Sequence, residues 1–125
     1  MRSKRILIVE DDADLRRLFR MSLIVAGYDV EEASDGIEAL QLVENRTPDL
    51  VVLDLVLRVL DGLSVQQELA ARAVTQHIPV VIVTGSTLEP GGFNVARVLR
   101  KPVMPDELVR TVSMCLAPAA PGAQA

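Results

Sequence analysis

The chain contains the stretch Leu50-Val51-Val52-Leu53-Asp54, in which four apolar residues end in a carboxylate. Such a run fits a strand that is buried on both faces, because helices cover both sides of a parallel sheet. A carboxylate directly after a buried strand needs a partner or a ligand. Three other apolar runs lead into polar side chains in a similar way: Ile6-Leu7-Ile8-Val9 into Glu10, Asp11 and Asp12, Val80-Val81-Ile82-Val83 into Thr84, and Val98-Leu99 towards Lys101.

These apolar runs alternate with segments of helical period, which predicts an α/β fold with a parallel sheet. We expect strands near 5–9, 29–33, 50–54, 79–83 and 97–100. We expect helices near 13–26, from Gly36 to before Thr47, after Asp61 as N-cap, and from Pro105 onward. Right-handed crossovers bring the carboxyl ends of the strands to one edge of the sheet, where ligands bind in folds of this kind.

The apolar spacing of each predicted helix indicates which side chains face the core. The expected inward positions are Leu15, Leu18, Phe19, Ser22 and Leu23 or Val25; Ile37, Leu40 and Val43; Val65, Leu69 and Ala73; and Leu108, Val112, Cys115 and Leu116. Gly27 is expected to end the first helix. Residues 85–96 include Pro90, Gly91 and Gly92, so we expect a short turn or loop there instead of a full helix.

Length and composition limit the possible classes of protein. A chain of 125 residues fits one domain, here residues 1–117, and we expect the Pro- and Ala-rich residues 118–125 to form a disordered tail. The net charge is −4 and the basic residues are scattered without aromatic neighbours, which argues against direct nucleic-acid binding. No apolar stretch reaches the roughly 18–20 residues of a membrane span. Cys115 is the single cysteine, which excludes a disulfide framework. From these features together, we expect a soluble, cytoplasmic protein.

The polar residues at the strand ends suggest a specific chemistry. Several carboxylates with room for water suit Mg²⁺, which prefers oxygen ligands and often shares phosphate oxygens. Asp54 could then act as a nucleophile that forms an aspartyl phosphate. Lys101 would neutralise charge on the transferred group, and Thr84 could donate a hydrogen bond to it and move towards it.

Several motifs, in this order and spacing, resemble the receiver domain of two-component response regulators. The matching segments are Ile6–Asp12, Asp14–Arg16, Ala33–Leu40, Pro48–Asp54, Asp61-Gly62, Pro79–Gly85 and Lys101-Pro102. Each motif alone is weak, but together they extend from about residue 4 to residue 117.

The resemblance implies a flavodoxin-like (βα)5 fold, a doubly wound five-stranded parallel sheet in the order 2-1-3-4-5. It implies that Asp54 accepts a phosphoryl group from a sensor histidine kinase or a histidine phosphotransfer protein. It also implies that Asp11 ligates Mg²⁺, that Glu10 acts mostly through water, and that the carbonyl of Val56 supplies a further ligand. By this resemblance the domain is not an enzyme. It catalyses only its own phosphorylation and its own slow dephosphorylation. By the same resemblance, the Lys101–Pro102 peptide is expected to be cis.

The chain departs from the family pattern at three positions and in one spacing. Arg58 stands where such domains usually carry proline, Val98 replaces an aromatic switch residue, and Met104 replaces a capping serine or threonine before the last helix. Lys101 follows Thr84 by only 17 positions (101 − 84), which shortens or disrupts the family's fourth helix. We therefore expect that this domain does not use the family's common dimer face of fourth helix, fifth strand and fifth helix.

Simpler interpretations remain open for individual residues. The acidic trio at 10–12 could cap the following helix, and Arg16, Arg17 and Arg20 could be a solvated helix face or a kinase-docking surface. His77 is expected to face solvent.

Two other functions stay open for the whole chain. One is a phosphatase that turns over an aspartyl phosphate, although Val56 stands where such enzymes commonly carry a second aspartate. The other is a degenerate receiver that acts only as a protein-interaction module.

Overall fold

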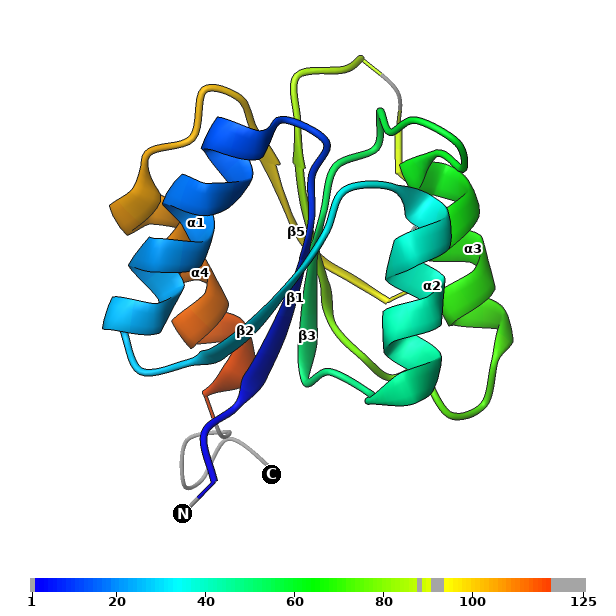
Figure 1. The fold of residues 1–125 in the computed structure, drawn as a ribbon, viewed down its shortest axis with the longest axis horizontal. Helices are drawn as coiled ribbons and strands as arrows, with labels where there is room; N and C mark the ends of the chain where they lie inside the picture. Colours follow the sequence, from blue (N-terminus) through cyan, green and yellow to red (C-terminus); the bar gives the residue numbers. More distant parts are fainter. Residues whose placement is uncertain (1, 88, 91–93, 118–125) are drawn as a thin grey trace, which may run out of the picture.

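The computed structural model describes residues 2–87, 89–90 and 94–117. Its elements follow one another as β1 (Arg5–Val9), α1 (Ala13–Val25), β2 (Asp29–Ala33), α2 (Gly36–Asn45), β3 (Leu50–Leu53), α3 (Gly62–Ala71), β4 (Val80–Thr84), β5 (Val95–Arg100) and α4 (Pro105–Leu116). Figure 1 shows α1 and α4 on one face of the sheet and α2 and α3 on the other. None of the helices in the described part of the chain is long and apolar enough to cross a membrane.

All five strands are parallel and lie in the order β2-β1-β3-β4-β5, which confirms the predicted topology. The register decides where the polar residues emerge. Val9 is paired with Leu53, so Glu10 and Asp54 leave the sheet at the same level. Thr84 is paired with Arg100, so Lys101 follows on the same edge of the sheet. The expected gathering of polar groups at one edge is confirmed.

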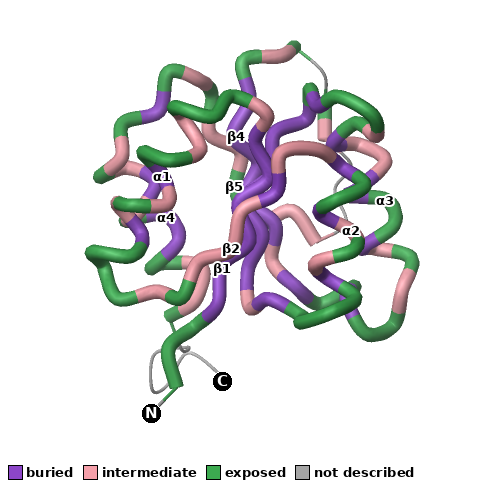
Figure 2. The backbone as a smooth tube through the Cα atoms, in the orientation of Figure 1, coloured by how far each residue is buried: buried purple, intermediate pink, exposed green. Residues whose placement is uncertain are grey.

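The alternation of side chains along β1 divides the interior into two cores. Leu7 and Val9 face the core under α2 and α3, whereas Ile6 and Ile8 face the core under α1 and α4. Both sides of the central strands are therefore apolar, which explains the uninterrupted Val/Ile/Leu runs. Figure 2 shows this buried sheet between helices whose outer surfaces are exposed. The edge strand β2 has the polar sequence DVEEA, which discourages pairing with another chain.

Aspartates define the start of three helices. Asp12, Asp35 and Asp61 are the N-caps of α1, α2 and α3, and each side chain accepts a hydrogen bond from a backbone N–H of the first turn. Met104 precedes α4 without a side-chain cap, as predicted. Gly27 has φ 103°, which fits its predicted place after α1.

Some predicted inward positions are wrong. Leu18 is 46% exposed, whereas Phe19 and Leu23 form the buried stripe of α1. Of the alternatives Leu23 and Val25, Leu23 is thus the inward one, and Val25 is 87% exposed. Successive helical residues turn by about 100°, which places Leu18 and Val25 beside that stripe. Ile37 lies on the outer side of α2 for the same reason.

The boundaries of other elements also differ from the prediction. Ala73 lies beyond α3, because the backbone becomes extended at Arg72. Strand β5 begins at Val95, two residues earlier than expected, because Val95 already pairs with Val80. Thr84 is the last residue of β4 instead of the first residue after it.

Two predicted irregular segments have different outcomes. Between β4 and β5 no helix occurs among the described residues 85–87, 89–90 and 94, as expected. The predicted tail, residues 118–125, lies outside the described part of the chain. The Lys101–Pro102 peptide is cis, as predicted.

Candidate functional site

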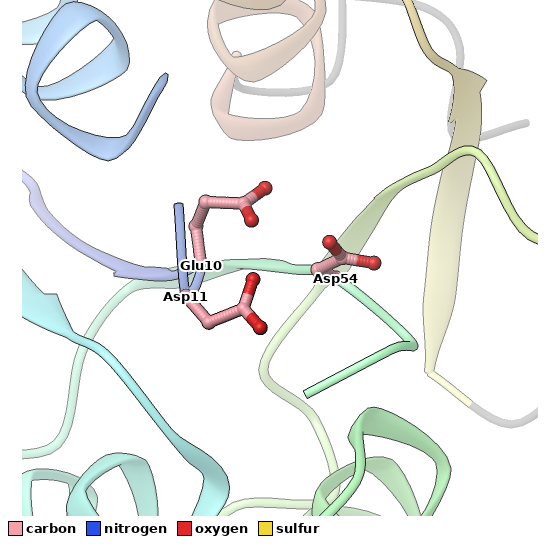
Figure 3. Close-up of side chains that lie close together, drawn as sticks. All are labelled: Glu10, Asp11 and Asp54. Atoms are coloured by element: carbon pink, nitrogen blue, oxygen red, sulfur yellow. The ribbon is translucent and has the colours of Figure 1, made fainter. Parts of the chain in front are cut away.

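Three carboxylates lie together at the carboxyl edge of the sheet. Glu10 and Asp11 follow β1, and Asp54 follows β3. Each contributes one oxygen to a group in which all of these oxygens lie within 4.8 Å of one another. Figure 3 shows the three side chains side by side. Glu10 is 2% exposed and Asp54 is 5% exposed, so their charges are largely removed from water.

Lys101 supplies the compensating positive charge. Its Nζ lies 2.8 Å from Oε1 of Glu10 and 2.8 Å from Oδ2 of Asp54. The ammonium therefore bridges two buried carboxylates that come from different strands. Lys101 follows β5, so this contact depends on the β4–β5 pairing that brings the end of β5 to the same edge.

The pKa values of this group reflect the competition between burial and charge. Burial raises the pKa of the Glu10 carboxyl, the hydrogen bonds from Lys101 and the Asp12 amide oppose this, and the charge of Asp54 adds to the rise. Burial alone would lower the pKa of Lys101, but its hydrogen bonds and charge interactions with Asp54 and Glu10 outweigh it, so the pKa is raised. Lys101 therefore carries a positive charge at neutral pH.

Backbone amides hold the remaining carboxylate oxygens. The N–H of Val56 donates to Oδ1 of Asp54 over 3.0 Å, and the N–H of Asp12 donates to Oε2 of Glu10 over 3.2 Å. Both oxygens of Asp54 thus have a donor, which fixes the orientation of the carboxylate. Val56 itself is 54% exposed beside this carboxylate.

Thr84 is fully buried at the end of β4, and its hydroxyl oxygen accepts a hydrogen bond from the N–H of Ser86 over 3.1 Å. A hydroxyl that accepts a hydrogen bond can also donate its own proton. The carbonyl of Thr84 accepts a hydrogen bond from the N–H of Lys101 over 3.0 Å, so the two residues are linked through the backbone.

A pocket of about 640 Å³ opens onto this edge. Its lining residues are Asp11, Asp54, Val56, Thr84, Gly85, Ser86, Thr87 and Lys101. Every residue expected to take part in the chemistry lines this pocket, except Glu10, which lies beneath it as a partner of Lys101. The pocket is large enough for a phosphoryl group with its first water shell.

The carboxylates fit the geometry that Mg²⁺ requires. Mg²⁺ binds oxygen ligands at about 2.0–2.1 Å, so ligand oxygens on opposite sides stand about 4.2 Å apart. Oxygens of Glu10, Asp11 and Asp54 within 4.8 Å of one another can approach this spacing with small movements. The donor set consists of oxygen only, and the open pocket leaves room for the water molecules that Mg²⁺ retains.

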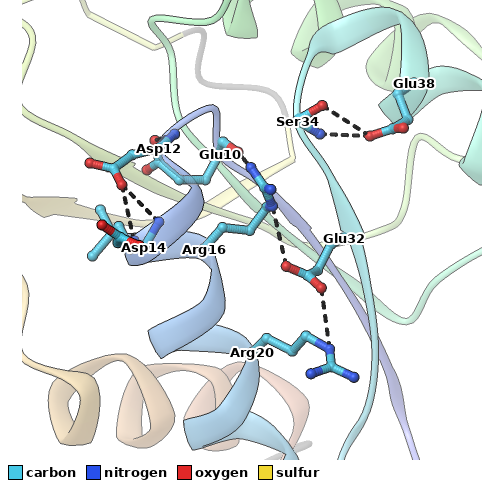
Figure 4. Close-up of polar contacts among 9 residues, drawn as sticks. Glu10, Asp12, Asp14, Arg16, Arg20, Glu32, Ser34 and Glu38 are labelled. Atoms are coloured by element: carbon cyan, nitrogen blue, oxygen red, sulfur yellow. Dashed lines mark hydrogen bonds and ion pairs between the residues drawn. The ribbon is translucent and has the colours of Figure 1, made fainter.

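Arg16 holds the backbone of the acidic segment, a role that the sequence did not reveal. Its Nη1 donates to the carbonyl of Glu10 over 2.7 Å, and its Nε donates to Glu32 of β2 over 3.2 Å. Arg20 pairs with the other oxygen of Glu32 over 3.2 Å. Figure 4 shows both arginines turned towards Glu32. Of the three arginines considered for docking, Arg17 is the one whose residue is exposed.

Two further predictions are decided by local contacts. Asp12 accepts hydrogen bonds from the N–H groups of Asp14 and Leu15, so this member of the acidic trio caps α1 and lies outside the carboxylate group. His77 is exposed, as expected.

Arg58 reaches Asp11, a contact that spacing alone could not indicate. Its Nε lies 3.8 Å from Oδ2 of Asp11, and its side chain is 77% exposed. The sequence marked Arg58 only as a departure from the family pattern.

Comparisons with known proteins agree with this geometry. The family model of the response regulator receiver domain matches residues 6–113. Response regulator MprA of Mycobacterium sp. (strain KMS) is 46% identical over 80 residues, which is 64% of this chain and 34% of that protein. The chain therefore spans about a third of the length of that curated relative.

Solved structures show the same fold. Chemotaxis response regulator CheY4 of Vibrio cholerae superimposes with a TM-score of 0.85 at 26% identity, over 92% of this chain and 100% of that one. A CheY-like response regulator receiver domain protein of Methanospirillum hungatei JF-1 gives 0.83 at 29% identity, over 92% and 94%. The five-stranded flavodoxin-like topology is thus shared along nearly the whole chain.

Removal of the Lys101 ammonium is expected to destabilise the metal-free protein. Lys101→Met leaves the two buried carboxylates without a cation, which should lower the free energy of unfolding by about 2–3 kcal/mol, less than a fully buried pair because Lys101 is partly exposed. Urea denaturation at pH 7 without divalent cation measures this loss. Lys4→Met, which removes the exposed second lysine of the chain, is the matched control.

The same loss should depend on pH and on Glu10. A carboxyl whose pKa is raised on folding contributes stability below its ordinary pKa and loses it as the pH rises through the raised value. The deficit of Lys101→Met should therefore shrink from pH 7 to pH 4, and Glu10→Gln in the same protein should recover part of it. Equal losses in the Lys4 and Lys101 variants would contradict this account of the charges.

Proposed function

The chain belongs to the response regulator receiver domain family, and from this membership and the geometry of the acidic edge we propose that it accepts a phosphoryl group on Asp54. The donor would be a phosphohistidine of a sensor histidine kinase or of a histidine phosphotransfer protein. One observation carries the proposal: Asp54 stands beside Glu10, Asp11 and Lys101 in an open pocket, with both of its oxygens oriented by donors.

In the proposed transfer, a carboxylate oxygen of Asp54 attacks phosphorus. A new O–P bond forms, the P–N bond to the donor imidazole breaks, and the imidazole leaves and takes up a proton. Bound Mg²⁺ would neutralise charge on the carboxylates and on the transferred phosphoryl oxygens. Asp11 and Asp54 would hold it directly, Glu10 mostly through water, and the carbonyl of Val56 would supply a further ligand.

Lys101 is proposed to donate first to the Asp54 carboxylate and, after transfer, to the phosphoryl group. Its Nζ lies 2.8 Å from Oδ2 of Asp54 before transfer, so it can donate to a phosphoryl oxygen once the carboxylate has been phosphorylated. The bond from Lys101 to Glu10 keeps the ammonium at this edge throughout.

Thr84 is proposed to report the phosphoryl group to the rest of the domain. Its hydroxyl would donate to a phosphoryl oxygen, which requires the buried side chain to turn towards the pocket that it lines. Because the carbonyl of Thr84 accepts a hydrogen bond from the N–H of Lys101, this movement would be transmitted to the end of β5. A local change of charge would thus become a conformational signal.

Labelling with acetyl phosphate tests the proposed function. In the presence of Mg²⁺, the protein should gain one phosphoryl group in an intact mass spectrum, and Asp54→Asn should gain none. The matched control Asp106→Asn, at an exposed position of α4, should label like the wild type. Labelling of Asp54→Asn would show that a residue other than Asp54 is the acceptor. Turnover without a labelled protein would indicate a phosphatase, and no reaction at all would indicate a degenerate receiver.

We infer that the phosphorylated domain does not dimerise through β5 and α4. The described residues between β4 and β5 form no helix, and the half-buried Val98 occupies the place of the aromatic switch residue. Beryllofluoride with Mg²⁺ should therefore produce no dimer that depends on this face in analytical ultracentrifugation. A dimer that Arg97→Glu, a change at an exposed residue of β5, dissociates would contradict this inference.

A further inference from the structure

We propose that Arg58 is a tethered counter-ion of Asp11 that competes with the divalent cation for this carboxylate and lowers the cation affinity of the site. The inference rests on the proposed function, because it takes Asp11 to be a cation ligand. It adds a residue of this chain that sets how much divalent cation the site requires.

The charges at the site are divided between two cations. Lys101 forms ion pairs with Glu10 and Asp54, the two carboxylates that are almost completely buried. Asp11 is more accessible, with 29% of its side chain exposed, and Arg58 is the cation beside it at 3.8 Å. Within residues 2–87, 89–90 and 94–117, no other cation is paired with Asp11. A divalent ion at this carboxylate must therefore share it with Arg58 or displace the guanidinium.

The loop between β3 and α3 directs Arg58 towards Asp11. The N–H of Leu60 donates to the carbonyl of Arg58 over 2.8 Å, which closes a γ-turn around Val59. Val59 has φ 71°, a conformation that is strained for a β-branched residue. The turn is thus held by its surroundings and not by the preference of its own residue.

Both ends of this loop are fixed by close backbone contacts. A Cβ at Gly62 would lie 2.1 Å from the carbonyl oxygen of Asp54, and a Cβ at Gly36 would lie 2.1 Å from the carbonyl oxygen of Leu60. The N–H of Gly62 also donates to the carbonyl of Leu55 over 2.9 Å. The loop therefore has little freedom to carry Arg58 away from the site, whereas the exposed side chain has room for a cation to displace it.

The exposure of Arg58 limits the size of the effect. An ion pair of this kind, with one partner 77% exposed, is weak and screened by salt. Its loss corresponds to about a two- to fivefold change in the dissociation constant of a competing cation. Arg58 would thus adjust the cation affinity without abolishing binding.

A Mg²⁺ titration of the metal-free protein tests the proposal. Backbone amide chemical shifts of the pocket residues report binding without requiring phosphorylation. Arg58→Ala should lower the dissociation constant for Mg²⁺ about two- to fivefold at low ionic strength. Arg58→Lys, which keeps the charge, should remain closer to the wild type.

The matched control is Arg17→Ala, which removes the same charge from an exposed residue of α1. It should change the dissociation constant much less, and the difference between the two variants should diminish at high salt. If the wild type binds Mg²⁺ and Arg58→Ala behaves like Arg17→Ala, Arg58 does not compete for Asp11, and the proposed function stands. If no variant binds Mg²⁺, both the cation site and the role of Arg58 are wrong.

Discussion

Lys101 places one ammonium between a carboxylate that follows β1 and a carboxylate that follows β3. Both carboxylates are buried, and removing the partner of a buried charge costs on the order of 3–5 kcal/mol. The pairing therefore constrains three strands at once: β1 and β3 must end level, and β5 must end beside them. The register of Val9 with Leu53 and of Thr84 with Arg100 meets this requirement.

The same edge also has to stay open. Glu10 and Asp54 are buried, whereas Asp11 and Val56 are accessible, so the site has a fixed inner part and a reachable outer part. The inner part sets the charge and orientation of Asp54. In the proposed function, the outer part is where a cation and a phosphoryl group would meet Arg58. A signalling site of this kind gains from the division, because ligands can exchange while the acceptor keeps its geometry.

Much of the fold followed from periodicity. Continuous apolar runs predicted the central strands, and Gly36, Asp61 and Gly27 marked helix ends that the structure confirms. The assembly of Glu10, Asp11, Asp54, Thr84 and Lys101 at one edge followed from the handedness of the crossovers. What periodicity could not resolve were the margins of the apolar faces: Leu18 and Val25 lie beside the buried stripe of α1.

The contacts of long, flexible side chains were also beyond the sequence. Arg16 reaches a backbone carbonyl six residues away, and Arg58 reaches Asp11 from a loop that turns at Val59. Both contacts depend on loop geometry and rotamers, and neither has a spacing rule. The positive φ of Val59 is itself unexpected for a β-branched residue.

We propose that Glu10, Asp11 and Asp54 form a single cation site, in which Asp54 is also the phosphoryl acceptor. Crystals grown with Mn²⁺ in place of Mg²⁺ test it most directly, because Mn²⁺ accepts the same oxygen ligands and can be located by its anomalous scattering. The account predicts one strong anomalous peak within coordination distance of Asp11 and Asp54. Saturating Mn²⁺ that leaves these carboxylates without a peak would contradict it.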